Sequence, residues 1–566
     1  MHARLKGMGM IDVIIGVALI LILFLALFGV LRASLSLSAL AKAKATAVEL
    51  ASTQMEYLRG LSYDSLGTVG GVPAGLIPQT SITAIDGISY TIRTFIIYTD
   101  DPADGTGVQD ANGVTVDYKT SKVTVSYSFN GLAKSITLLS NFVPPGIESS
   151  TGGGTLSIHV VNAANADVVG ADVHIVNTEI SPAIDFTTFT NTEGFAIIGG
   201  AATSSEYQVY VSRTGYSSAQ TYERTGQNVN PTPGYLTVSK DHVTDGTFFI
   251  DLLSTLEISS FSPAVTTTFS DSFADSSGLA SQDGTRVTGG ALTLTSEGLL
   301  GSARSSSITP SYLNGWGILS ATLSTPPGTT AVVRVRDASG ALIPDSTLSG
   351  NAAGFSSFPI SLTEIPVSVY SSITLSAELT SNSTTTASEI LDWSVSYTDG
   401  PIPLPNVIFT LTGAKTIGTD ANSAPIYKTI VNGTTGAGSE KTEMLEWDSY
   451  SLTGVTNLIE NCPASPYSLT PANTTDAVLL AGALTTNTLP IIVENSASSP
   501  IANAKVVLAK NGYAATVLTS SCGFAYFNGL ASGTYSATVS AIGYATTTFP
   551  GIAVSGHSVT SILILP

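Results

Sequence analysis

The pattern of apolar and polar positions changes once along the chain, near residue 60. Before this point, residues 13–31 form an apolar run without a charged side chain. A run of this length is close to the ~20 residues that a membrane-spanning helix needs. Residues 33–59 follow without a proline and are rich in the helix formers Ala, Leu, Glu, Lys and Gln. The pattern predicts one helix over residues 8–60, which spans a membrane with residues 11–31.

The second half of this helix is expected to pack on a β domain. Apolar and small residues recur there at three- and four-residue spacing, which is typical of an amphipathic helix. Gly60 is the expected helix end. The expected contact stripe consists of Leu37, Leu40, Ala41, Lys44, Val48, Ala51, Met55 and Leu58.

After residue 60 the apolar positions alternate with a period of two, which indicates strands. Residues 89–100, 121–130 and 133–143 alternate in this way. Residues 61–148 are therefore expected to form a head in which a small antiparallel sheet packs against the helix. The predicted fold class is α+β for this N-terminal part, followed by a string of all-β sandwich domains.

An internal repeat organises the rest of the chain. Residues 155–254 and 488–566 each contain a strand, a turn, an Ala-x-Val strand, a Gly-Phe-Ala strand start and a last strand that ends in Gly-Tyr. A weaker copy is expected over residues 401–487. Matched glycines mark the turns of the two clear copies, and repetition of this kind indicates one structural unit used more than once. The matched pairs are Gly194 with Gly523 and Gly215 with Gly543.

The repeat resembles the carboxypeptidase regulatory-like domain, a small transthyretin-type β-sandwich. The resemblance implies non-catalytic domains that act as rigid spacers or adhesive modules, because the zinc ligands of the carboxypeptidases belong to another domain. Between the copies, Ser/Thr-rich short strands over residues 256–400 indicate a jelly-roll or lectin-like sandwich. Trp316 and Trp393 could stack on a sugar there, although single tryptophans in such strands are more often core residues.

Composition narrows the class of protein. A chain of 566 residues is long enough for about three to five domains. Only 11% of its residues are charged and the net charge is -19, which disfavours nucleic acid as a partner. Two cysteines in so long a chain fit a cell surface. Cys462 and Cys522 fall in neighbouring predicted domains, where a disulfide would stiffen the end of the tail; two separate buried thiols are the alternative.

An acidic residue, Asp12, stands just inside the apolar run, where a carboxylate is costly and needs a partner. A secretory signal peptide has a shorter apolar core and a small-residue cleavage site. A plain membrane anchor accounts for the length of the run but not for Asp12 or for the glycine before it. A third interpretation accounts for all three features.

The leader MHARLKG, ending in Gly7, followed by a helix with Asp12 as its fifth residue, resembles the class III leader of type IV prepilins. The resemblance implies that a prepilin peptidase cuts after Gly7 and methylates the new amine of Met8. Asp12 matches an acidic residue that most members carry as glutamate. Between helices of a filament, that carboxylate and the amine of a neighbouring subunit would neutralise each other. Arg4 and Lys6 favour a cytoplasmic N-terminus.

A Gly-rich loop between the first two predicted head strands carries many oxygen ligands. Calcium takes six to eight oxygens, and related pseudopilins use a calcium loop in this region of the head. A solvated turn is the alternative, because Asp, Asn and Gly are common in turns. The candidate ligands are Asp100, Asp101, Asp104, Asp110, Asn112 and Asp117.

No catalytic motif is expected. The histidines do not form a zinc-protease pattern, and neither a nucleophile elbow nor a phosphate-binding loop occurs in the sequence. The chain is therefore not expected to be an enzyme.

The sequence thus predicts a minor, low-copy or tip, type IV pilin-like subunit. The expected partners are prepilin peptidase, other pilin subunits, the cytoplasmic membrane before assembly, and an unknown surface or cell target of the extracellular tail. Two alternatives remain open: a pseudopilin-like component of a secretion system, and a surface protein permanently anchored by an uncut helix.

Overall fold

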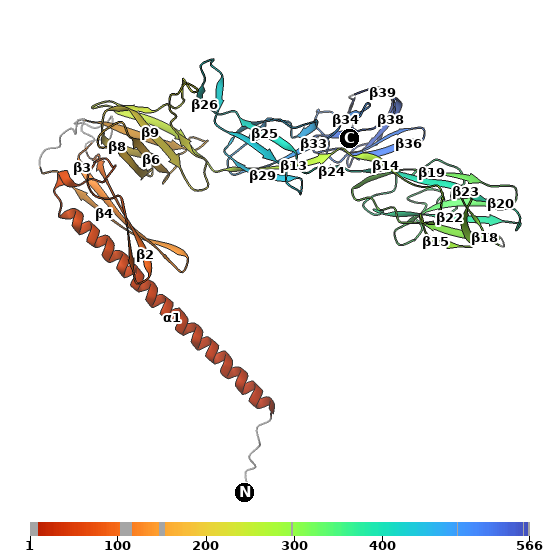
Figure 1. Ribbon diagram of the computed structural model, residues 1–566, viewed down its shortest axis with the longest axis horizontal. Helices are drawn as coiled ribbons and strands as arrows, with labels where there is room; N and C mark the ends of the chain where they lie inside the picture. The colour runs from red at the N-terminus through yellow and green to blue at the C-terminus, as the bar shows by residue number, and fades with distance from the viewer. Residues whose placement is uncertain are drawn as a thin grey trace, which may run out of the picture. The chain divides into compact units, whose positions relative to one another are not determined.

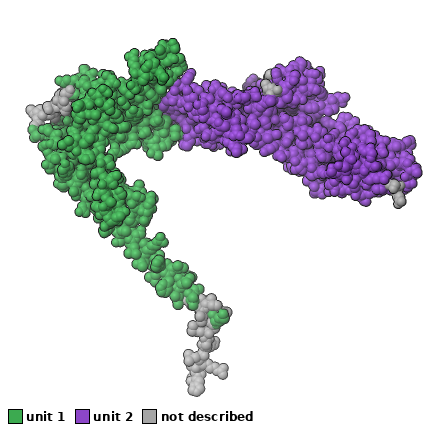
Figure 2. Space-filling view, viewed as in Figure 1, with its two compact units in different colours: residues 1–253, 416–426 green, residues 254–415, 427–566 purple. Residues whose placement is uncertain are grey.

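The computed structural model describes residues 10–101, 103, 116–145, 153–295, 298–483, 485–557 and 560–563. One long helix is followed by many β-sheets (Figure 1). The chain divides into two compact units, which are coloured separately in Figure 2. Unit 1 comprises residues 1–253 and 416–426, and unit 2 comprises residues 254–415 and 427–566.

Unit 1 begins with helix α1, Met10–Arg59, which is 50 residues long. A short 3-10 turn, η1 (Tyr63–Ser65), leads into an antiparallel sheet with the order β1-β2-β3-β4. The sequence did not predict the first of these strands. The strands are β1 (Thr80–Ile85), β2 (Ile88–Thr99), β3 (Tyr118–Phe129) and β4 (Leu132–Phe142).

The second half of α1 packs on this sheet through only part of the expected stripe. Ala51, Met55 and Leu58 are buried as expected, but the stripe residues before them are not. Leu37 is 71% exposed, Val48 is 40% exposed, and Ala41 and Lys44 are also exposed. The buried face recurs every three or four residues and consists mostly of alanines, which leave room for the large rings of Tyr90 and Tyr127. Its members are Ala43, Ala47, Ala51, Met55 and Leu58.

Polar contacts fix the helix on the sheet at several positions along its length and beyond its end. The hydroxyl of Tyr90 donates to the carbonyl of Ala43 at 3.3 Å, and the amide of Gln54 donates to Thr94 at 3.1 Å. Beyond the helix end, buried Lys119 donates to the carbonyls of Tyr63 and Leu66 at 2.7 and 2.9 Å. Burial lowers the pKa of Lys119 to about 8. These contacts hold the helix, the following turn and the sheet together as one head.

The first sandwich of unit 1 has two facing sheets. One has the order β12-β5-β8, with β12 parallel to β5, and the other has the order β10-β9-β6-β7, with β11 also on β9. The strands are β5 (Gly154–Val161), β6 (Asp172–Asn177), β7 (Ile184–Phe189), β8 (Phe195–Ala201), β9 (Ser204–Ser212), β10 (Ala219–Gln220), β11 (Leu236–Val238) and β12 (Val243–Phe249).

The last sandwich, in unit 2, repeats this topology. Its sheets have the orders β37-β34-β40, with β34 and β40 parallel, and β36-β35-β38-β39. The strands are β34 (Leu489–Glu494), β35 (Lys505–Lys510), β36 (Tyr513–Leu518), β37 (Phe524–Phe527), β38 (Gly533–Ser540), β39 (Thr547–Val554) and β40 (Thr560–Leu563).

The turn glycines that match in sequence also match in structure. Gly194 and Gly523 have φ of 74° and 72°, a conformation that favours glycine. The carbonyl of Gly194 accepts from Val160 at 2.8 Å, and that of Gly523 accepts from Val493 at 2.7 Å. The two domains therefore share a turn conformation and its hydrogen bond.

A third copy lies between these two in the chain, and its boundaries differ from the expected ones. Its first strand, β13 (Ser254–Ser262), pairs in parallel with β33 (Thr474–Ala481) and antiparallel with β29 (Glu440–Leu445). The expected boundaries 155–254, 256–400 and 401–487 placed this strand outside the domain it completes. The pairing joins residues more than 180 positions apart in sequence, which a local pattern does not reveal.

The remaining strands of this middle sandwich follow the same plan. The second sheet has the order β28-β25-β30-β32, and β24 and β31 extend the first. Tyr207, Tyr450 and Tyr535 each donate a hydroxyl proton to a carbonyl four or five residues earlier. The strands are β24 (Ile402–Pro403), β25 (Ile408–Gly413), β28 (Ile430–Thr434), β30 (Asp448–Thr453), β31 (Leu458–Cys462) and β32 (Tyr467–Leu469).

A hairpin leaves the middle sandwich between β25 and β28. It consists of β26 (Thr416–Thr419) and β27 (Pro425–Tyr427). Within unit 1, the backbone amides of Val229 and Thr232 donate to the carbonyls of Thr419 and Ile417 at 3.0 Å each. These bonds explain why residues 416–426 belong to unit 1.

An inserted sandwich lies between β13 and β24. Its core contains Trp316 and Trp393, which are both fully buried, so neither is a surface for stacking on a sugar. The sheets have the orders β16-β17-β23-β19-β21, with β14 on β23, and β15-β18-β22-β20. The strands are β14 (Val265–Asp271), β15 (Leu279–Asp283), β16 (Thr285–Thr288), β17 (Ala291–Leu294), β18 (Leu300–Ser305), β19 (Leu313–Ser324), β20 (Thr329–Asp337), β21 (Ile360–Ser361), β22 (Ile373–Ser381) and β23 (Glu389–Asp399).

Candidate functional site

From Val17 onward, the first half of α1 presents an exposed apolar surface in unit 1. From residue 17 the helix has a window with a mean hydropathy of 2.5, none of which is buried. Its large side chains are more than half exposed from Val17 to Leu37. A surface of this kind is expected to be covered by lipid or by other helices, because exposing apolar side chains to water is unfavourable. By length and composition, α1 is able to cross a membrane.

The residues of the expected processing site lie at the edge of what the structure describes. Gly7 and Met8 lie outside the described residues. Asp12 belongs to α1, but its side chain is also outside them. The roles of these three residues remain predictions from the sequence.

Three of the six expected calcium ligands lie in the described part of the head. The backbone amide of Asp101 donates to a carboxylate oxygen of Asp117, which is buried at the start of β3. Asp101 in turn accepts from the amide of Ala103 at 3.0 Å. Asp104, Asp110 and Asn112 lie outside the described residues, as does most of the loop. Asp100, at the end of the described part before the loop, is half-buried.

Calcium at this loop stays a prediction. Millimolar calcium is expected to raise the melting temperature of the head, because a bound cation stabilises only the folded state. Asp110→Ala should remove that rise, as measured by differential scanning calorimetry with and without a chelator. A rise of the same size in the variant, or none in the unaltered chain, contradicts the site.

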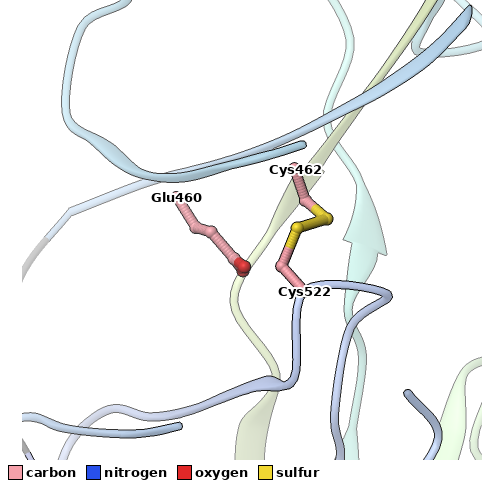
Figure 3. A group of neighbouring side chains, drawn as sticks. All are labelled: Glu460, Cys462 and Cys522. Carbon is pink, nitrogen blue, oxygen red and sulfur yellow. A yellow bond between two sulfur atoms is a disulfide. The ribbon is translucent and has the colours of Figure 1, made fainter. Parts of the chain in front are cut away.

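The two cysteines meet in unit 2, where a disulfide joins the middle and last sandwiches. Cys462 ends β31, and Cys522 lies in the turn between β36 and β37. Their Cα atoms are 5.9 Å apart. Figure 3 shows the bond beside the carboxyl group of Glu460. A carboxylate oxygen and the two sulfurs lie within 4.8 Å of one another, but both sulfurs are used in the disulfide and so do not form a thiolate metal site.

Glu460 lines an apolar cavity of about 380 Å³ within unit 2. Burial raises the pKa of its carboxyl to about 7, and a hydrogen bond from Ser520 at 3.0 Å opposes that rise. Ser520 also accepts from the backbone amides of Cys522 and Phe524, both at 3.3 Å. No sequence pattern singles out Glu460, because the strands and the turn around it come from different domains. The apolar lining includes Phe261, Val478, Leu480, Val517, Phe524 and Tyr526.

The raised pKa of Glu460 predicts that stability depends on pH. A carboxyl with a raised folded pKa favours the folded state fully below its ordinary value near 4.5, and this contribution is lost as pH rises to about 7. The free energy of unfolding of unit 2 should therefore fall by about 1–3 kcal/mol between pH 5 and pH 8, after allowance for partial solvation. Urea unfolding at both values measures it. Glu460→Gln should remove this part of the fall, and an unchanged pH dependence in the variant contradicts it.

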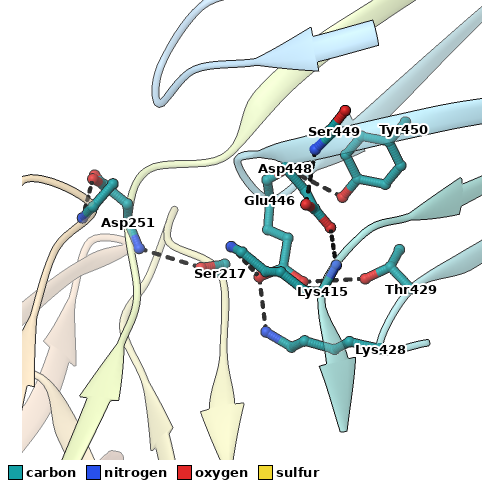
Figure 4. Close-up of polar contacts among 10 residues, drawn as sticks. Ser217, Asp251, Lys415, Lys428, Thr429, Glu446, Asp448, Ser449 and Tyr450 are labelled. Atoms are coloured by element: carbon teal, nitrogen blue, oxygen red, sulfur yellow. Dashed lines mark hydrogen bonds and ion pairs between the residues drawn. The ribbon is translucent and has the colours of Figure 1, made fainter. Parts of the chain in front are cut away.

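A second buried carboxylate, that of Glu446, forms ion pairs with two lysines. Lys415 and Lys428 pair with one of its oxygens at 3.2 and 2.8 Å, and Thr429 donates to the other at 3.1 Å (Figure 4). Burial lowers the pKa of Lys415, and Glu446 opposes this shift. The aromatic ring of Trp447 lies 3.1 Å from the ammonium of Lys415. The charges and hydrogen bonds of this network are satisfied within the middle sandwich.

Figure 4 also draws one polar contact of unit 1, in which the backbone amide of Asp251 donates to the hydroxyl of Ser217 at 3.2 Å. This bond closes the first sandwich near its last strand. It carries no reactive group.

A basic groove of about 430 Å³ lies in unit 1 between the head sheet and the first sandwich. The guanidinium of Arg93 and the ammonium of Lys122 lie 5.2 and 5.5 Å from the centre of the Phe189 ring. Arg93 also donates to the carbonyl of Thr187 at 2.8 Å. These contacts bind the two domains to each other, so the groove is explained as a domain contact.

Comparison with known families assigns the last sandwich. Residues 488–564 match the carboxypeptidase regulatory-like domain. This confirms the resemblance predicted for residues 488–566. The first and middle sandwiches lie outside the match and share the strand order of this carboxypeptidase regulatory-like domain.

Solved structures of bacterial proteins match the chain only with low TM-scores. The Bacillus anthracis TIE protein is 11% identical, with 86% of this chain and 72% of that one covered and a TM-score of 0.16. The major pilin subunit BcpA of Bacillus cereus is 10% identical, with 73% and 99% covered and a TM-score of 0.14. The minor pilin GBS52 of Streptococcus agalactiae is 15% identical, with 29% and 84% covered and a TM-score of 0.13. TM-scores of this size do not establish a common fold. No curated protein sequence matches the chain.

Proposed function

We propose that the chain is a low-copy or tip subunit of a type IV pilin-like filament. The observation that carries the proposal is α1, a single helix of 50 residues. Its first half exposes its apolar side chains, while its second half packs on the head sheet through Ala43, Ala47 and Ala51. One half is thus free to enter a membrane or a bundle of like helices, while the other carries a folded head.

Processing of the leader would allow this helix to leave the membrane and enter a filament. Cleavage after Gly7 by prepilin peptidase would leave Met8 as a methylated N-terminus. Asp12 would then pair with the amine of a neighbouring subunit in the apolar bundle, where each charge alone is costly. The basic residues Arg4 and Lys6 would keep the N-terminus in the cytoplasm and the tail outside.

The tail would project from the filament and contact a surface or another cell. Its sandwiches suit a spacer or adhesive role, and we propose no catalytic activity for it. A tail of this size would crowd the lattice if every subunit carried it, which favours a tip or low-copy position. A pseudopilin role would place the same tail inside the cell envelope, and finding the protein in filaments outside the cell would exclude that alternative.

The N-terminus of the mature protein tests the processing step. Mass spectrometry of membrane-extracted protein should find a chain that begins at Met8 with an added methyl group. A variant that replaces Gly7 with a bulky residue should remain uncut. A mature chain that begins at Met1 would indicate a permanent anchor, and one cut near Ser34 would indicate a secreted protein; either contradicts the proposal.

Filament entry is tested separately at Asp12. Asp12→Ala should leave cleavage intact but strongly reduce the amount of the protein in sheared filaments. Asp12→Glu is the matched control, because it keeps the carboxylate and should keep incorporation. Equal incorporation of the Ala and Glu variants would contradict the role of this charge.

A further inference from the structure

The cavity beside the disulfide has the features of a binding site for a small organic molecule. Its volume of about 380 Å³ lies within the range of small-molecule sites, which are mostly apolar with a few polar groups. The walls come from all three sandwiches of unit 2: Phe261 and Val478 from the middle one, Asn314 from the inserted one, and Phe524 from the last. The cavity therefore exists only when the three are assembled.

The polar side of the cavity is dominated by one acid. Of the described residues that line it, Glu460 alone is charged. Among the residues that the structure describes, no lysine or arginine pairs with Glu460, in contrast to Glu446 with its two lysines. Ser520 donates to Oε1, which leaves Glu460 with acceptor capacity to spare. A buried carboxylate without a cation is stabilised most by a ligand that carries a positive charge. If the rest of the ligand is apolar, it can also fill the apolar part of the cavity.

We propose that this cavity binds a small primary amine with an apolar body. The ammonium group would pair with Glu460, and the hydrocarbon part would contact Phe261, Leu480 and Phe524. A neutral molecule of the same shape gains only the apolar contact, and an anion would meet the carboxylate. The proposal is independent of the filament role, because it depends only on unit 2.

Binding should depend on pH through Glu460. Burial raises the pKa of this carboxyl to about 7, so a large majority of it is ionised at pH 8 and a small minority at pH 6. The affinity for the amine should fall about tenfold between these values, in proportion to the ionised fraction. The other titratable group that lines the cavity is Tyr526, whose pKa is raised by burial and which stays neutral over this range. Cys462 and Cys522 do not titrate, because they are bonded to each other.

The test uses the full chain in lipid nanodiscs with benzylamine as the probe, chosen because it is small and dissolves in water. Isothermal titration calorimetry should find saturable binding of one benzylamine per chain at pH 8 and about tenfold weaker binding at pH 6. Benzyl alcohol, the neutral counterpart of similar shape, should bind at least tenfold more weakly. Empty nanodiscs give the background.

Two variants distinguish the cavity from general association with the acidic chain. Glu460→Gln keeps an oxygen that can accept from Ser520, so it should fold, and it should bind benzylamine at least tenfold more weakly. Glu440→Gln removes an exposed carboxylate in the same unit and should bind like the unaltered chain. No saturable binding at pH 8, equal binding by the Glu460 variant, or equally tight binding of benzyl alcohol would overturn the proposal.

Discussion

Ala47→Asp should detach the helix from the head sheet and lower the free energy of unfolding of the head by about 3–5 kcal/mol. Ala47 is fully buried on the middle of the contact face, between Ala43 and Ala51. Because Ala47 is fully buried, a longer side chain has no room there. A carboxylate at this position would also be buried without a cation. The helix would keep its own backbone bonds, so the loss falls on the contact with the sheet.

Hydrogen exchange followed by mass spectrometry should detect this loss as faster exchange in β2 and β3, with the sandwiches of unit 2 unchanged. Ala45→Asp is the matched control, because Ala45 lies on the exposed side of the same turn. It carries the same helix-propensity cost, which is under about 1 kcal/mol, without burial of the charge. If both variants exchange alike, the alanine face does not hold the head.

The choice of contact face shows what the sequence could and could not predict about this helix. Its length and its apolar first half follow from local composition, and both agree with α1. The buried face follows only in part. Ala51, Met55 and Leu58 are buried as expected. Leu37 and Val48 are exposed, and Ala43 and Ala47 face the sheet instead. That choice depends on Tyr90 and Tyr127, which lie on strands far away in the sequence.

In the β tail too, some features could be predicted from the local sequence, and others depend on residues that are far apart in the chain. Repeated turns and strand patterns were sufficient to predict the last sandwich, which the family match confirms. The middle sandwich was assigned wrong limits, because its first strand, β13, precedes the inserted domain. Strand pairing across an insertion has no local signature. Glu460 was missed for a related reason, since the apolar surroundings that raise its pKa come from separate domains.

Replacing both cysteines with serine should lower the stability of unit 2 by about 4 kcal/mol. The bond closes a loop of 60 residues, and the chain-entropy relation gives about that value for a loop of this length. Guanidinium unfolding of the full chain measures the change. Ser521→Ala is the matched control, because it removes only a hydroxyl that lies 2.9 Å from the sulfur of Cys462. Thiols that alkylate in the denatured, unreduced chain would contradict the bond itself.

The same double variant tests whether the disulfide affects the pKa of Glu460, which lies beside it. The bond holds the Cys522 turn, and with it Ser520 and Phe524, against β31 on one side of the Glu460 cavity. Without it, water should reach the carboxyl more easily, and the pKa of Glu460 should move down from about 7 toward its ordinary value. The fall in stability between pH 5 and pH 8 that depends on Glu460 should then shrink, as measured by comparing the double variant with and without Glu460→Gln. A fall of unchanged size would mean that the cavity stays closed without the disulfide, and that packing of the three sandwiches alone keeps Glu460 from water.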